Sequence, residues 1–136
     1  MDRTFDIDQA NAALTAVAPL LATLADQRLE LIRLRDRTLA SSPAGPDGSG
    51  SVDEEEGRRL RLRMQGVIDQ MAAAVAQIDT LGITLRDIER GLIDFPSEVD
   101  DRQVWLCWQL GEGRVEYWHE IDTGFEGRQP LATLGR

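Results

Sequence analysis

The sequence predicts an α+β fold in which a long antiparallel α-helical hairpin, similar to a coiled coil, precedes a small C-terminal antiparallel β-sheet. Three observations support this prediction. Apolar residues recur at helical spacing over residues 1–81, a segment rich in Ser, Pro and Gly interrupts them at 41–52, and residues 83–122 change to a pattern rich in aromatic and β-branched side chains. At 136 residues the chain is long enough to bury a core, so we expect a single domain over 1–136.

The first helix is expected over residues 1–40. Asp6 and Gln9 form a capping box, in which each side chain accepts a hydrogen bond from the other residue's backbone N–H. Pro19 lacks a backbone N–H, so we expect the helix to be kinked near this residue. The apolar face follows in steps that are mostly three, four or seven residues long: Ile7, Ala10, Leu14, Val17, Leu21, Leu24, Leu31 and Leu34.

Residues 41–52 are predicted to form a flexible loop, because nine of the twelve are Ser, Pro or Gly. A second helix is expected over 53–81, where a heptad seam can pack against the first helix. Helix faces outside the seam, such as those of Leu62, Ile68 and Val75, are expected to form a homodimer interface. The seam steps alternately by four and three residues: Leu60, Met64, Val67, Met71, Ala74, Ile78 and Leu81.

Antiparallel strands are expected over 83–122, with a polar connection at 97–102, and a loop and tail over 123–136. The two strongest strands flank a glycine-rich turn at 111–113. A two-residue turn would place His119 on the core face and Cys107 on the opposite face. A three-residue turn would instead pair Trp105 with His119, and Cys107 with Tyr117. We favour the first register, because the second pairs polar with apolar positions. In it, Cys107 and His119 cannot share a metal ion.

Composition excludes several classes of partner and compartment. The net charge of −9 disfavours binding to nucleic acid or to an anionic membrane surface in this acidic protein. No apolar run approaches the roughly 18 residues of a membrane span, and the first residues do not resemble a secretory signal. The single cysteine, Cys107, excludes an internal disulfide and favours a reducing cytoplasm.

Short motifs along the chain resemble those of a known family. The segment GLIDFP at 91–96 resembles a G-L-hydrophobic-D-F-P signature, and LCW at 106–108 with GE at 111–112 resembles L-C-W-x-x-G-E. WH at 118–119 and GFEGRQP at 124–130 resemble its closing motifs, while Phe5, ANA at 10–12 and Pro19 resemble its start. Together they resemble the prokaryotic family catalogued as domain of unknown function 2203. The resemblance implies a small cytoplasmic protein, and it brings no established activity, cofactor or catalytic residue.

Two classes of function remain open. The favoured class is a non-enzymatic interaction or scaffold module, which acts through the helical hairpin as a homodimer or with a protein partner. No residue is assigned a catalytic role, and the preferred register disfavours Cys107 as a nucleophile with His119 as its base. The alternative class is a small-ligand or metal site on the C-terminal sheet.

The residues of this alternative site follow from their chemistry. Cys107 and His119 are the metal candidates, because a thiolate with a neutral imidazole suits zinc. Asp94, Glu112, Trp118 and Arg128 are the candidates for binding a small ligand. A guanidinium such as that of Arg128 can bind a carboxylate or phosphate with two hydrogen bonds. Alternatively, Arg128 holds the C-terminal segment to the sheet through Glu112 or Asp94.

Overall fold

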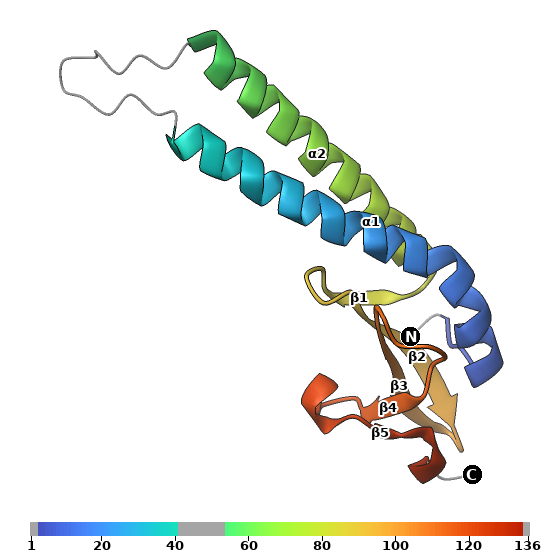
Figure 1. The fold of residues 1–136 in the computed structure, drawn as a ribbon. Helices are drawn as coiled ribbons and strands as arrows, with labels where there is room; N and C mark the ends of the chain where they lie inside the picture. Colours follow the sequence, from blue (N-terminus) through green and yellow to red (C-terminus); the bar gives the residue numbers. More distant parts are fainter. Residues whose placement is uncertain (1–2, 41–53, 135–136) are drawn as a thin grey trace. The chain divides into compact units, whose positions relative to one another are not determined.

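The computed structural model describes residues 3–40 and 54–134, which form two long helices and a five-stranded antiparallel sheet (Figure 1). The predicted fold class is confirmed, whereas the predicted loop at 41–52 lies outside the described residues. The helices are α1 (Ile7–Ala40) and α2 (Glu54–Thr80). Neighbouring strands are consecutive in the chain: β1 (Thr84–Asp87), β2 (Leu92–Val99), β3 (Arg102–Gln109), β4 (Tyr117–Glu120) and β5 (Gln129–Pro130).

The chain divides into two compact units, one formed by residues up to Ala25 and from Ala74 onward, the other by Asp26–Ala73. In the second unit, α1 and α2 pack against each other along the predicted seam. Leu60 and Val67 of α2 are buried against Leu34 of α1. Partly buried apolar residues surround them: Leu31, Met64 and Met71. The seam is therefore an internal contact of the hairpin. Among the described residues, neither helix is long and apolar enough to cross a membrane.

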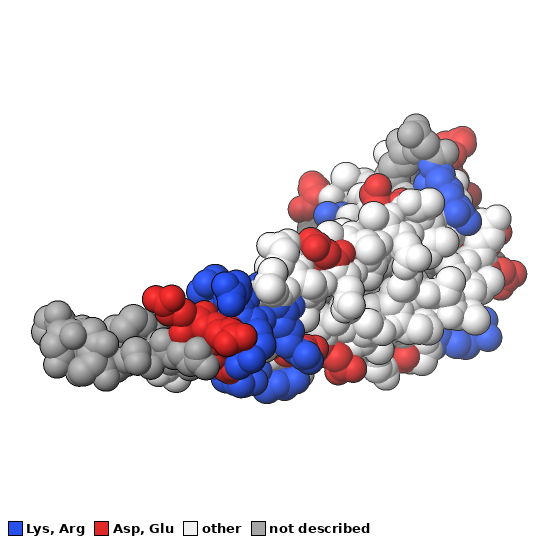
Figure 2. Space-filling model, turned by 90° about the horizontal axis from the view of Figure 1, so that it is seen from above, with Lys and Arg blue, Asp and Glu red and all other residues white. Residues whose placement is uncertain are grey.

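Charged side chains of the second unit pair across the two helices. Arg63 donates to Glu30 at 2.6 Å, and Arg37 donates to Glu56 at 3.1 Å. Figure 2 shows basic and acidic side chains next to one another near the grey residues. The arginines of these pairs are mostly exposed, and such pairs contribute only about 0.2–1 kcal/mol each. Burial of the apolar seam therefore contributes more to the stability of this unit than the ion pairs do.

The first unit begins with the predicted capping box. The Gln9 N–H donates to Asp6 Oδ1 at 2.7 Å, and the Asp6 N–H donates to Gln9 Oε1 at 2.9 Å. The helix then continues through Pro19 without interruption. Figure 1 shows the axis of α1 changing direction within its blue N-terminal part. Pro19 is exposed, so its ring and its missing N–H lie on the solvent side.

One face of the sheet packs against the start of the chain. The rings of Phe5 and Phe95 meet edge to face at 5.1 Å. The Phe5 N–H donates to the Pro96 carbonyl at 2.7 Å, and Ser97 Oγ donates to the Phe5 carbonyl at 2.6 Å. This face, which we call the inner face, carries buried apolar side chains from three strands: Ile93, Phe95, Val104, Leu106, Trp108 and Trp118. The opposite face is called the outer face.

The pairing of β3 with β4 contradicts the register favoured from the sequence. Trp105 lies opposite His119, and Cys107 lies opposite Tyr117. Cys107 and His119 therefore both lie on the outer face, whereas the favoured register separated them. The residue pairs of the rejected alternative are the correct ones, although the connection between the two strands, residues 110–116, is longer than either predicted turn.

Side chains hold this connection away from the strand ladder. Asn11 Oδ1 accepts from the Val115 N–H at 2.7 Å, and Glu112 Oε1 accepts from the Gln109 N–H at 2.9 Å. The indole N–H of Trp108 donates to the Gly113 carbonyl at 2.9 Å. These backbone groups are satisfied outside the ladder, so the two strands pair only from Tyr117 onward and the register moves by one residue.

Two further segments differ from the predictions. The expected polar connection at 97–102 instead extends β2 to Val99, and Asp100 and Asp101 turn the chain with φ of 52° and 64°. Positive φ at both positions is typical of a type I′ hairpin. The predicted loop and tail over 123–136 contains β5 and two 3₁₀ turns, Phe125–Gly127 and Leu131–Thr133. The described part of this segment, residues 123–134, pairs with β4 and contacts the sheet.

Replacing Gly91 with alanine is expected to lower the free energy of unfolding by about 1–3 kcal/mol. Gly91 has a φ of +63°, and a Cβ there would lie 2.5 Å from the Cβ of Leu110. Denaturant unfolding measures the change, with Gly113→Ala as the control, because a Cβ at Gly113 meets nothing within 4 Å. Equal destabilisation by the two substitutions would contradict the close approach at Gly91.

Candidate metal centre

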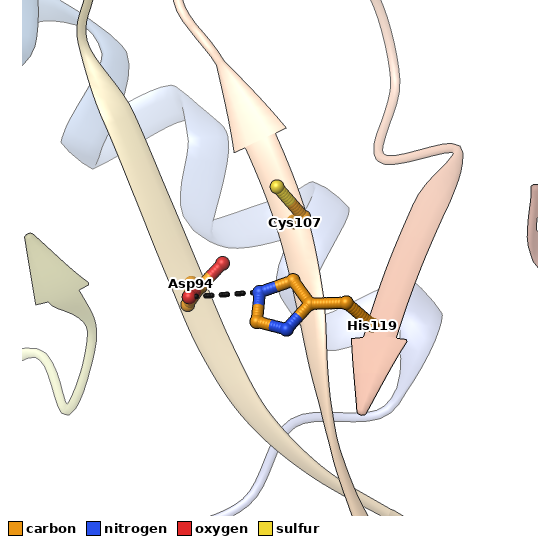
Figure 3. A group of neighbouring side chains, drawn as sticks. All are labelled: Asp94, Cys107 and His119. Atoms are coloured by element: carbon orange, nitrogen blue, oxygen red, sulfur yellow. Dashed lines mark hydrogen bonds and ion pairs between the residues drawn. The ribbon is translucent and has the colours of Figure 1, made fainter. Parts of the chain in front are cut away.

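Three adjacent strands bring three different metal-ligating side chains together on the outer face. Asp94 of β2 lies opposite Cys107 of β3, and His119 of β4 lies opposite Trp105, two residues from Cys107. Figure 3 shows the three side chains converging. One carboxylate oxygen, the thiol sulfur and one ring nitrogen all lie within 4.8 Å of one another. All three residues are at least 98% buried, with exposures of 2% for Asp94, 0% for Cys107 and 1% for His119.

Hydrogen bonds fix the orientation of the His119 ring. Nδ1 lies 2.8 Å from the carbonyl oxygen of Glu120, which can only accept, so Nδ1 carries a proton. Nε2 lies 3.0 Å from Asp94 Oδ2. The two groups need either a second proton or a cation between them, because each otherwise presents a lone pair to the other. The ring is therefore oriented with Nε2 toward the cluster.

Arg86 of β1 also contacts the Asp94 carboxylate. Its Nε donates to Asp94 Oδ2 at 2.8 Å, and its guanidinium lies over the Trp105 ring, 4.8 Å from the centroid. The Arg86 side chain is 42% exposed, whereas that of Asp94 is 3% exposed. Oδ2 thus serves both Arg86 and His119, and Figure 3 shows the other carboxylate oxygen turned toward Cys107.

The surroundings of Cys107 favour its protonated form. Burial raises the pKa of the thiol from 9.0 to about 12, the charge of Asp94 adds to this rise, and the nearby Arg128 guanidinium opposes it. At neutral pH the thiol is therefore protonated when no metal ion is bound. His119 cannot act as its base in this arrangement, because both ring nitrogens face other partners. The geometry does not favour nucleophilic catalysis by Cys107.

Arg128 is held in place beside Cys107 by an ion pair and two aromatic rings. Its two terminal nitrogens donate to Glu112 Oε1 and Oε2 at 3.2 Å and 2.6 Å. Its guanidinium lies 3.9 Å from the ring centroid of Tyr117 and 4.3 Å from that of Phe125. The structure therefore shows the ion pair with Glu112 that the sequence offered as one alternative, and this pair attaches the C-terminal segment to the outer face.

The structure does not bring all of the predicted site residues together. Asp94, Cys107 and His119 form one cluster. Arg128 lies beside Cys107 and forms an ion pair with Glu112. Trp118 lies on the inner face, where it is buried opposite Leu106 and its indole N–H donates to Thr133 Oγ1 at 3.0 Å. Trp118 therefore belongs to the core and is separated from the cluster by the sheet.

Sequence reasoning did not identify Arg86, Trp105 or Phe125 as parts of the site. Arg86 reaches Asp94 because the pairing of β1 with β2 shifts between Leu85 and Asp87, and no local sequence pattern marks this bulge. The sequence places polar and apolar residues together on the face that carries Cys107, a mixture that fits either an open face or a pocket. The C-terminal half contains both arginines and aromatic residues, which can stack on each other. This composition is the signal that could have indicated that side chains lie over the outer face.

A hollow of about 370 Å³ opens beside Asp94 and His119. Both side chains form part of its wall, so the hollow lies next to the cluster. Seven other residues line it: Arg86, Leu92, Ile121, Asp122, Thr123, Gly124 and Phe125.

Raising the pH is expected to destabilise the metal-free protein through Cys107. The pKa of this thiol is about 12 in the folded protein against 9.0 for an ordinary thiol, so the unfolded chain loses the proton first. The contribution of the protonated thiol to the free energy of unfolding is fully present below the pKa of the thiol in the unfolded chain. It is lost as the pH rises toward the pKa of the thiol in the folded protein, at up to about 1.4 kcal/mol per pH unit. Urea unfolding from about pH 8 to about pH 11, with a chelator present, compares the wild type with Cys107→Ala. The difference between their free energies of unfolding should narrow as the pH rises, and a constant difference would contradict the assignment.

Comparison with family models matches residues 3–131 to the family described as uncharacterized conserved protein (DUF2203). Neither the curated proteins nor the solved structures contain a match to this chain. The family match covers nearly the whole chain, including all five strands and the three clustered side chains. The protein therefore belongs to the DUF2203 family of uncharacterized conserved proteins.

Proposed function

We propose that the protein binds one divalent transition-metal ion, preferably zinc, through Asp94, Cys107 and His119. The convergence of carboxylate, thiol and imidazole atoms within 4.8 Å carries this proposal. These are the donor types that zinc takes in proteins, and a tetrahedral zinc site separates such atoms by about 3.3–3.6 Å. Side-chain movements of about 1 Å would therefore bring the cluster to bonding geometry.

The contacts around the cluster support the same proposal. Nδ1 of His119 donates to a backbone carbonyl, which is the arrangement that directs the other ring nitrogen to a metal ion. Arg128 beside Cys107 lowers the pKa of the thiol, against the larger effect of burial, and so assists formation of the thiolate, which is the form that binds metal. Binding would release the thiol proton to solvent as the sulfur–metal bond forms.

Three protein ligands leave one tetrahedral position for a water molecule or a small ligand. This arrangement is typical of reactive zinc sites, whereas structural zinc sites have four protein ligands. The hollow beside Asp94 and His119 lies where such a ligand could enter. We therefore propose a ligand-binding metal centre. A cytoplasmic location fits it, because a reducing compartment keeps the Cys107 thiol available.

Zinc binding is expected at about one ion per chain when the protein is purified without chelator, as measured by elemental analysis. Asp94→Asn, Cys107→Ala and His119→Ala should each weaken zinc binding by more than about a hundredfold, because even residues that only support a metal ligand contribute tenfold to a hundredfold. Glu116→Gln is the control, since Glu116 is an exposed carboxylate outside the cluster. Circular dichroism establishes that each variant is folded.

A wild-type protein that takes up no zinc after dialysis against it would contradict this proposal. Zinc binding by Cys107→Ala that is as tight as zinc binding by Glu116→Gln would contradict the assignment of the Cys107 thiolate as a metal ligand. Cobalt gives an independent readout on the wild-type protein, because a thiolate bound to Co²⁺ produces an intense near-ultraviolet charge-transfer band. Absence of that band in a cobalt-loaded protein would exclude Cys107 as a ligand.

The interaction module favoured from the sequence remains a second candidate, because apolar side chains are exposed on the helices of the second unit. Leu29, Leu62 and Ile68 are 48%, 67% and 42% exposed. The seam itself is buried within the hairpin, so a partner would contact these outer residues. We propose that a second copy of this chain covers them, with another protein as the alternative partner.

Sedimentation at micromolar concentration is expected to show a dimer. The double substitution Leu62→Glu and Ile68→Glu should convert it to a monomer, because it places charges in the proposed apolar interface. Gln103→Glu is the matched control, since it adds a charge at an exposed position in the sheet. A wild type that sediments as a monomer at all concentrations would contradict the homodimer.

A further inference from the structure

We propose that the hollow beside the metal centre binds a small molecule through one oxyanion group, a carboxylate or a phosphate, which Arg86 holds. A second contact of this oxyanion, with the metal ion, rests on the proposed metal function. The contact with Arg86 does not, because it needs only the side chains of this chain. It assigns a ligand class to the hollow of about 370 Å³.

Arg86 has free donors and a fixed position. Its Nε donates to Asp94 Oδ2 at 2.8 Å. Within the part of the chain that the structure describes, its two terminal nitrogens make no hydrogen bond. The Trp105 ring supports one face of the guanidinium. A guanidinium held at one end and on one face loses little conformational freedom when it binds a ligand. Its two terminal nitrogens match two oxygens of a carboxylate or phosphate.

The remaining lining of the hollow favours a small ligand with one oxyanion group and no further negative charge. Arg86 is the one arginine among the lining residues, and Asp122 adds an exposed carboxylate that repels further negative charge. Leu92, Ile121 and Phe125 add apolar surface for the rest of the ligand. The volume lies at the lower end of the range for small-molecule sites. A nucleoside triphosphate fits neither the charge nor the size.

The hollow also borders the proposed metal position. Asp94 accepts from Arg86 and belongs to the proposed metal-binding cluster, so the guanidinium and the metal ion would both contact one carboxylate. An oxyanion in the hollow can then interact with both positive centres. It should bind more tightly to the zinc-loaded protein than to the metal-free protein.

Acetate, inorganic phosphate and chloride are titrated into the zinc-loaded protein and, separately, into the chelated protein. Nuclear magnetic resonance follows the Arg86 Nε–H and the backbone amides of Thr123 and Gly124. We expect saturable shifts with acetate, phosphate or both, and none with chloride. A response to acetate alone indicates a carboxylate ligand, and a response to phosphate alone indicates a phosphate ligand.

Arg86→Gln should weaken the binding at least tenfold, and Arg86→Lys should restore part of it. Arg102→Gln is the matched control, because Arg102 also pairs with a carboxylate and lies over a tryptophan ring, but does not line the hollow. If Arg86→Gln does not fold, Asp122→Asn tests the same site, since loss of this carboxylate should strengthen anion binding severalfold.

The outcomes separate this inference from the metal function. Zinc binding without any anion-dependent shift would overturn the inference and leave the metal centre standing. Anion binding that Arg86→Gln abolishes, in a protein that takes up no zinc, would support the inference and overturn the metal function. Anion binding that is equal in Arg86→Gln and Arg102→Gln would overturn the assignment of Arg86.

Discussion

The hydrogen bond between Asn11 and the Val115 backbone, together with the pairing of β4 that follows it, controls which side chains meet on the outer face. Pairing from Tyr117 onward turns His119 to the same side as Cys107 and Asp94. A shift of one residue would send His119 to the inner face and leave a buried carboxylate with one partner fewer. This register therefore determines the cluster, the position of Arg128 over the outer face and the hollow.

The cluster contains a buried charged side chain, and burying charge costs free energy. An unpaired buried carboxylate is strongly unfavourable, and even a well-paired one often contributes no more to stability than apolar residues of equal volume. Here Asp94 is paired twice, through Arg86 and His119, and Arg128 is paired with Glu112 between two rings. Stability alone does not explain such a network, whereas a metal centre needs it, because each ligand must be held in one orientation.

The local parts of the fold could be predicted from the sequence, and the site could not be assembled from it. The capping box at Asp6 and the seam through Leu60 and Val67 involve residues a few positions apart, so helical geometry alone fixes them. The register instead depends on Asn11, which contacts Val115 across 104 positions. The sequence indicates Cys107 and His119 as metal ligands and Asp94 as a ligand-binding residue, but only the long-range pairing shows that the three face one another.

X-ray absorption at the zinc edge of the zinc-loaded protein identifies the atoms bound to the metal ion, and so tests whether Asp94, Cys107 and His119 hold it. We expect one sulfur at about 2.3 Å together with nitrogen and oxygen neighbours at about 2.0–2.2 Å. These neighbours correspond to Cys107, His119, Asp94 and one non-protein oxygen. A first shell without sulfur, or one with more than one sulfur per zinc ion, would show that Asp94, Cys107 and His119 do not form the metal site.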